Sequence, residues 1–212
     1  MIIPERDLAR VADAHRRLFE AVGALSDDDI GRPSLLPGWT IGHVLAHLAR
    51  NADSHVRRAA AARRGEVVDQ YPGGYGGRSA EIESGSSRSA RELADDVMQS
   101  ASAAEAAWVD LPGRLWSRRS RDANGKARPL FELPSRRWQE VEVHLVDLDI
   151  GITWASWPED FVLEWLPRTR ERVWDRLPPE ANNAEFDDPA EELAWLYGRL
   201  QRDDLPAPPP WG

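Results

Sequence analysis

The chain has 212 residues, enough for one domain or for a main domain with a small appendage. Its formal net charge of −9 argues against nucleic-acid binding, which depends on basic groups that neutralise phosphates. No run approaches the ~20 apolar residues of a membrane span, and the charged N-terminal stretch lacks the apolar core of a secretory signal, so we expect a cytoplasmic protein that does not bind membranes.

Helices are predicted along most of the chain, because apolar residues recur at helical spacing. The first predicted helix covers residues 5–25. The second runs from about residue 41 to 64, with Thr40 as its N-cap. The glycine-rich segment 71–77 is predicted to be a loop, and a third helix is expected over roughly 87–110.

The second half of the chain continues this pattern. Residues 122–125 read DANG, a turn sequence that can join two short strands. A fifth helix is expected to begin at Pro158, and a short one at about 189–200. The fourth helix is predicted over about 134–150, with these side chains directed inward: Trp138, Val141, Leu145, Val146 and Leu148.

These elements predict a mostly α protein with few strands. We expect an up-and-down four-helix bundle over residues 1–153, followed by a small C-terminal region over 154–212.

The sequence contains no cysteine. This excludes disulfides, thiolate metal sites and a cysteine nucleophile. Any metal ligand must therefore come from His, Asp or Glu, and any reactive thiol must come from outside the chain.

Histidines and one glutamate form the chemically most informative pattern. His43, His47 and His55 fall on the second predicted helix. Glu140 and His144 are four residues apart on the fourth, so their side chains lie on one face. Inward residues of facing helices build metal sites in bundles, and a His–His–Glu set suits zinc with an open fourth position. Such spacings also arise by chance, since many core histidines only pack.

Four motifs follow one another along the chain. Residues 36–59 read LPGWTIGHVLAHLARNADSHVRRA, and residues 71–97 read YPGGYGGRSAEIESGSSRSARELADDV. Residues 137–151 read RWQEVEVHLVDLDIG, and residues 194–212 contain AWLYGRL and end in LPAPPPWG. In this order they resemble the mycothiol-dependent maleylpyruvate isomerase family of the DinB-like superfamily, over nearly the whole chain.

The resemblance implies a ligand set and a reaction partner. His47, Glu140 and His144 match the family's ligands for Zn²⁺, and another divalent metal would suit the same residues. The implied cofactor is mycothiol or a related low-molecular-weight thiol, and the implied substrate is a small electrophile. Arg78 and Arg199 match two family arginines, which implies a catalytic role in holding substrate carboxylates and developing negative charge.

Several of these residues have alternative roles. Arg78 is expected either to bind cofactor and substrate or to pair with Glu81 or Glu83. Asn51, one turn after His47, is expected either to contact the cofactor or to cap a helix carbonyl.

Other polar residues are expected to support the site. His43 is interpreted mainly as a helix-start residue, and His55 is expected at the surface or at the site mouth. Arg137 and Asp147, three residues from Glu140 and His144 respectively, are candidates for orienting those ligands.

The chain departs from the family pattern after the predicted bundle. The isomerases carry an α+β domain there, and the residues between Pro178 and the WLYGR motif are too few for its strands. We therefore expect a shortened C-terminal domain and an altered pocket wall.

The implied activity is a zinc- and thiol-dependent cis–trans isomerisation of a maleylpyruvate-like unsaturated acid. The alternatives are an S-transferase that joins mycothiol or another small thiol to an electrophile, a metal hydrolase, and a bundle protein that binds metal without catalysis. A monomer and a homodimer are both compatible with the sequence.

Overall fold

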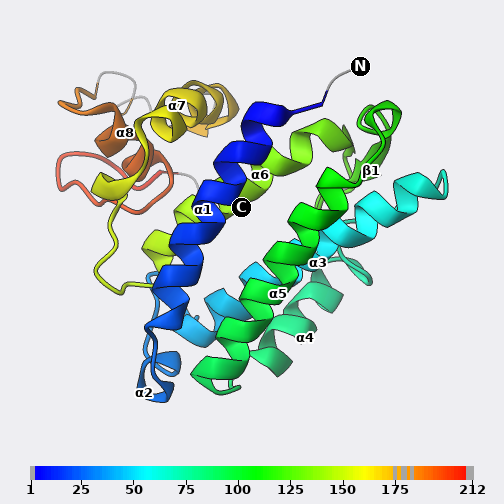
Figure 1. The fold of residues 1–212 in the computed structure, drawn as a ribbon. Helices are drawn as coiled ribbons and strands as arrows, with labels where there is room; N and C mark the ends of the chain where they lie inside the picture. The colour runs from blue at the N-terminus through cyan, green and yellow to red at the C-terminus, as the bar shows by residue number, and fades with distance from the viewer. Residues whose placement is uncertain (1–2, 174–175, 178–180, 182–183, 209–212) are drawn as a thin grey trace. The chain divides into compact units, whose positions relative to one another are not determined.

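The computed structural model describes residues 3–173, 176–177, 181 and 184–208. By packing, the chain divides into two compact units, residues 1–144 and 145–212; the predicted domain boundary after residue 153 remains a prediction. The helices and strands in Figure 1 are α1 (Glu5–Gly23), α2 (Asp27–Ile30), α3 (Ile41–Arg63), α4 (Gly74–Gly85), α5 (Ala90–Val109), β1 (Arg119–Arg121), β2 (Ala127–Pro129), α6 (Leu133–Asp147), α7 (Glu159–Val173) and α8 (Pro189–Leu196).

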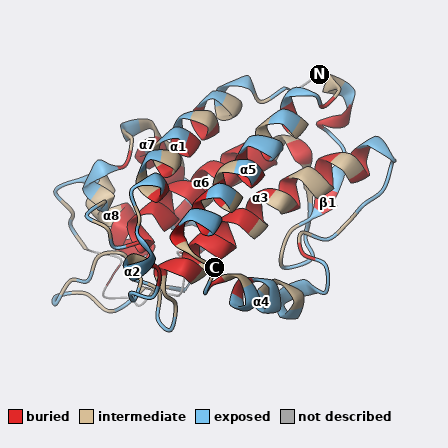
Figure 2. Ribbon diagram, turned by 60° about the horizontal axis from the view of Figure 1, so that its bottom comes forward, coloured by how far each residue is buried: buried red, intermediate tan, exposed pale blue. Residues whose placement is uncertain are grey.

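The long helices α1, α3, α5 and α6 form most of the first unit (Figure 1). α5 packs against both α1 and α3, and α4 lies along α3. Their facing sides are buried and their outer sides exposed, as Figure 2 shows. These helices match the predicted ones, and the inward residues predicted on α6 are all buried. Among the described residues, no helix has the length and apolar character that a membrane span needs.

The short hairpin was also predicted correctly. β1 and β2 pair antiparallel on either side of the DANG turn, with Ser120 opposite Arg128. Gly125 adopts a left-handed φ of 76°, which glycine tolerates without steric cost.

The glycine-rich segment 71–77 is only partly a loop, so this prediction was wrong at its end. The chain turns at Gly73, whose φ is 71°, and α4 begins at Gly74. A Cβ added to Gly77 would lie 2.0 Å from the Pro72 carbonyl oxygen. The glycines therefore permit a tight turn that leads directly into a helix.

Two helices end earlier than predicted. α6 ends at Asp147, and Asp149 just beyond it has a left-handed φ of 53°. α8 ends at Leu196, and Gly198 follows with a φ of 73°. A left-handed residue after the last turn is a common helix terminator.

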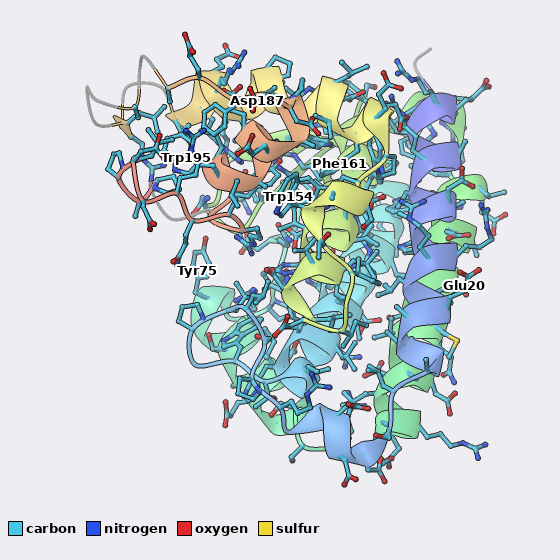
Figure 3. All side chains as sticks on the ribbon, turned by 90° about the vertical axis from the view of Figure 1, so that its left-hand side faces the viewer. Glu20, Tyr75, Trp154, Phe161, Asp187 and Trp195 are labelled. Atoms are coloured by element: carbon cyan, nitrogen blue, oxygen red, sulfur yellow. The ribbon has the colours of Figure 1, made fainter. Side chains whose placement is uncertain are left out.

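The second unit has its own aromatic core. The Trp157 ring packs 5.4 Å from Phe161 and 5.9 Å from Tyr197, measured between ring centroids. Figure 3 shows Phe161 on α7 and Trp195 on α8, and both side chains are buried. Within this unit α7 and α8 pack against each other.

A buried polar chain links the four long helices of the first unit. His15 Nδ1 on α1 lies 2.5 Å from a carboxylate oxygen of Glu105 on α5. Arg137 Nε on α6 donates to His15 Nε2 at 3.1 Å. Its Nη1 donates to the Leu48 carbonyl oxygen at 2.8 Å and to Asn51 Oδ1 at 3.0 Å, both on α3. Arg137, which is fully buried, therefore holds α6 against α3.

We expect Arg137→Met to lower the free energy of unfolding by about 3 kcal/mol, because it leaves buried acceptors on α1 and α3 without a donor. Arg137→Lys keeps the charge but not the planar fork, and is expected to recover only part of the loss. Urea unfolding measures both. A methionine variant within about 0.5 kcal/mol of wild type would contradict the role assigned to this residue.

Lowering the pH should also reduce the free energy of unfolding, because of His15. Burial lowers the pKa of His15 from 6.5 to about 4, and the hydrogen bond to Glu105 only partly opposes this. Between these pH values the unfolded chain binds a proton that the folded chain does not, so stability decreases as the pH falls. The loss attributable to His15 approaches about 3 kcal/mol. Urea unfolding at a series of pH values measures this. The free energy of unfolding of His15→Gln should fall less steeply with decreasing pH than that of wild type, and an equal fall would rule out this contribution.

Candidate metal centre

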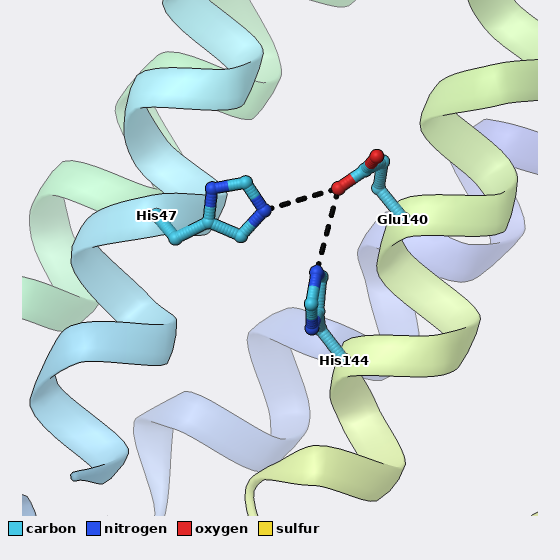
Figure 4. A group of neighbouring side chains, drawn as sticks. All are labelled: His47, Glu140 and His144. Carbon is cyan, nitrogen blue, oxygen red and sulfur yellow. Dashed lines mark hydrogen bonds and ion pairs between the residues drawn. The ribbon is translucent and has the colours of Figure 1, made fainter. Parts of the chain in front are cut away.

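His47, Glu140 and His144 come together in the first unit (Figure 4). Each offers one ligand atom, and these three atoms lie within 4.8 Å of one another. His47 Nε2 is 3.0 Å and His144 Nε2 is 3.4 Å from the same oxygen, Glu140 Oε2. The two imidazole rings meet edge to face, with centroids 4.7 Å apart and planes at 84°.

The start of α3 positions His47. Thr40 caps the helix, and its hydroxyl accepts a hydrogen bond from the His43 backbone N–H. The His43 ring contacts Thr40 through Nδ1, at 2.8 Å from the hydroxyl, and Glu83 through Nε2 at 3.2 Å. His43 is therefore a helix-start residue, as interpreted from sequence. His47, one turn later, faces α6 (Figure 4).

Burial sets the charge state of the cluster. The side chains of His47 and His144 are 3% and 6% exposed, and that of Glu140 is 27% exposed. Burial lowers the pKa of His47 to about 4, so the ring is neutral at neutral pH. Burial raises the pKa of Glu140, but hydrogen bonds to His144 and His47 outweigh it and hold the pKa well below its ordinary value. Two imidazole nitrogens with an ionised carboxylate are a donor set that fits Zn²⁺.

Arg78 lies beside this cluster. Its Nη2 is 3.1 Å from His47 Nδ1. Its guanidinium carbon lies 5.5 Å from the Trp39 ring centroid and 5.7 Å from that of Tyr71. Trp39 also meets His47 at 63°, with centroids 5.7 Å apart. Arg78 thus sits between two aromatic rings at the edge of the ligand cluster.

The alternative expectation for Arg78, an ion pair with Glu81 or Glu83, was wrong. Glu83 contacts His43, and Arg78 forms no ion pair with Glu81 or any other described carboxylate. The neighbouring aromatic residues, Trp39 and Tyr71, were not singled out from sequence. Their signal was their place inside two of the family-like motifs.

Asn51 is buried beneath the cluster, with its amide engaged at both ends. Its Oδ1 accepts from Arg137, and its Nδ2 donates to the Tyr71 hydroxyl at 3.4 Å. Its predicted contact with a cofactor remains a prediction. The hydrogen bonds described for Arg137 go to His15, Leu48 and Asn51, so it supports Glu140 through helix packing.

The expected position of His55 was wrong. His55 is neither at the surface nor at a site mouth, because only 2% of its surface is exposed. Its ring meets Trp108 edge to face at 5.1 Å, and Nδ1 lies 3.3 Å from Arg58 Nη2. α3 packs against both α4 and α5, which buries a wider part of its circumference than one amphipathic stripe.

Arg199 belongs to the second unit, where it pairs with Asp147. Nε and Nη2 of Arg199 contact the two Asp147 carboxylate oxygens at 2.7 and 2.6 Å. The Asp147 side chain is fully buried and that of Arg199 is 7% exposed. The predicted catalytic role of Arg199 remains a prediction, as does the orienting role of Asp147.

We expect His47→Ala and His144→Ala to lose stoichiometric zinc on reconstitution, because each removes one of three proposed ligands. Metal affinity should fall by more than the ~10–100-fold typical of losing an outer-shell partner. His43→Ala is the matched control on α3, expected to cost about 1 kcal/mol of stability and to keep its zinc. Elemental analysis after dialysis measures the metal; full zinc occupancy in both ligand variants would refute the ligand assignment.

A protein-family model matches much of the chain. The family described as "Mycothiol maleylpyruvate isomerase N-terminal domain" matches residues 11–149, a range that includes the whole ligand cluster. No curated protein sequence matches the chain.

Two solved structures share the fold. A crystal structure of the mycothiol-dependent maleylpyruvate isomerase gives a TM-score of 0.86 at 23% identity, covering 99% of this chain and 98% of its own. A histidine-to-alanine mutant of that isomerase gives a TM-score of 0.85 at the same identity and coverage. The predicted mostly α, DinB-like fold is thereby confirmed.

The structural match spans nearly the whole of both chains. The expected shortening of the C-terminal domain remains a prediction.

Proposed function

This chain belongs to the mycothiol maleylpyruvate isomerase N-terminal domain family, and from that premise we propose that it is a zinc- and thiol-dependent cis–trans isomerase of a maleylpyruvate-like unsaturated acid. The observation that carries the proposal is the convergence of His47, Glu140 and His144, with the Arg78 guanidinium in contact with His47.

The donor set supports a catalytic rather than a purely structural cation. His47 and His144 would each supply a nitrogen and Glu140 an oxygen, and three protein ligands leave a position open. A cation held there would supply the acidity that keeps an external thiol deprotonated, and this cysteine-free chain contains no thiol of its own.

The residues around the cluster suit an acidic substrate. Arg78 would hold a substrate carboxylate through paired N–H donors and stabilise negative charge that develops during the reaction. The Trp39 and Tyr71 rings flank its guanidinium and limit the water around it. Glu140, whose low pKa keeps it ionised, is unsuited to donate a proton and suited to bind a cation.

The competing functions gain less from the site. An S-transferase would use the same metal ligands and the same thiol, and would differ only in keeping the thiol in its product; the family match favours isomerisation. A hydrolase needs a general base beside the metal. His43 is held in the start of α3 and His55 is buried against Trp108, so neither is placed for that task.

The test is to incubate the zinc-loaded protein with mycothiol and maleylpyruvate and to follow the product by chromatography and mass spectrometry. We expect a product of unchanged mass with trans geometry. Activity should vanish without thiol, after chelation of zinc, and in His47→Ala, and it should persist in His43→Ala.

A stable product heavier by one thiol would instead identify an S-transferase. Turnover that survives both chelation and His47→Ala would refute the metal-dependent mechanism.

A further inference from the structure

The imidazole of His47 contacts Arg78 on one side and Glu140 on the other. Arg78 Nη2 lies 3.1 Å from His47 Nδ1, while Nε2 of the same ring lies 3.0 Å from Glu140 Oε2. A guanidinium has only donors, so His47 Nδ1 must accept with its lone pair. The ring is then neutral, and its proton sits on Nε2 and is donated to the Glu140 carboxylate.

This arrangement conflicts with metal binding at His47. If a cation takes Nε2, the ring stays neutral only when the Nε2 proton leaves and one is taken up at Nδ1. Nδ1 then becomes a donor that faces the donors of Arg78. If the cation takes Nδ1, it uses the lone pair that Arg78 occupies. In both cases the hydrogen bond from Arg78 to His47 must break.

Within the part of the chain that the structure describes, Arg78 has no anionic partner that would keep it in place once it is released. Among the described residues it forms no ion pair, and its other neighbours are the uncharged rings of Trp39 and Tyr71. A partly buried guanidinium without a carboxylate is suited to receive one from a ligand.

We propose that Arg78 and the cation compete for His47, so that metal binding frees the Arg78 guanidinium to receive a carboxylate of the substrate. By linkage, a carboxylate that engages Arg78 must in turn strengthen metal binding by the same factor. This inference rests on the proposed function, since it takes His47 as a ligand. It adds an ordered coupling between the metal and the acidic substrate.

The experiment measures zinc affinity by competition with a chromophoric chelator, with the full chain and without thiol. Wild type, Arg78→Met and Arg50→Met are compared with and without maleate as the dicarboxylate probe. Arg50 is the matched control: it lies one turn after His47 on α3, and it pairs with Asp96 and Asp53 instead of a ligand.

Without maleate, we expect Arg78→Met to bind zinc about tenfold more tightly than wild type, because a charge-assisted hydrogen bond to the metal-free ring is lost. Maleate should tighten zinc binding by wild type and Arg50→Met by about the same factor, and should leave Arg78→Met unchanged. Equal zinc affinities in the two variants would overturn the proposal. So would maleate tightening of Arg78→Met as large as that of wild type, since the dicarboxylate would then act on the metal alone.

Nitrogen-15 NMR of the wild-type imidazoles is a second test that needs no variant, because it reports which ring nitrogen carries the proton. His47 should carry its proton on Nε2 before zinc is added and should lose the Arg78 contact afterwards. Persistence of that contact in the zinc-saturated protein would overturn the inference and leave the proposed function standing. Failure of the wild type to bind zinc at all would overturn both.

Discussion

The candidate metal centre depends on the distance between α3 and α6, and a buried arginine sets that distance. Arg137 reaches from α6 to the carbonyl of Leu48, the residue directly after His47, and lies one turn before Glu140. The same guanidinium is tied through His15 to Glu105, so α1 and α5 also brace the contact. A side chain of this reach couples ligands that come from two facing helices.

The three proposed ligands also satisfy one another's hydrogen-bonding groups. Glu140 accepts from both histidines, so the atoms proposed as metal ligands are not left buried without partners. The carboxylate stays ionised because these contacts outweigh its burial. The price of this arrangement is that each hydrogen bond must be exchanged for a metal bond, and the contact between Arg78 and His47 belongs to the same exchange.

Fold and function rest on different observations in this protein. The solved isomerase structures establish the helical fold, but at 23% identity a shared fold does not transfer an activity. The family match over residues 11–149 covers the helices that carry the cluster and Arg78. The chemistry itself follows from the residues: a donor set that fits zinc, a cation beside it for acidic groups, and no thiol within the chain.

The amino-acid sequence by itself determined the long helices, the Thr40 cap, the hairpin turn, and the placement of Glu140 and His144 on one helical face. These features depend on local periodicity and capping, which neighbouring residues decide. The ligand set was chosen from sequence through family motifs, since spacing does not separate the three histidines of one helix.

Only the tertiary structure decided how those histidines are used. Helical period says which residues share a face, but the packing of α3 between α5, α4 and α6 decides what each face meets. That packing turned His47 to Glu140 and His55 to Trp108, whereas His43 is held at the helix start by its local contact with Thr40. It also brought Arg78 to His47, across 31 residues of chain, a contact that no local pattern specifies.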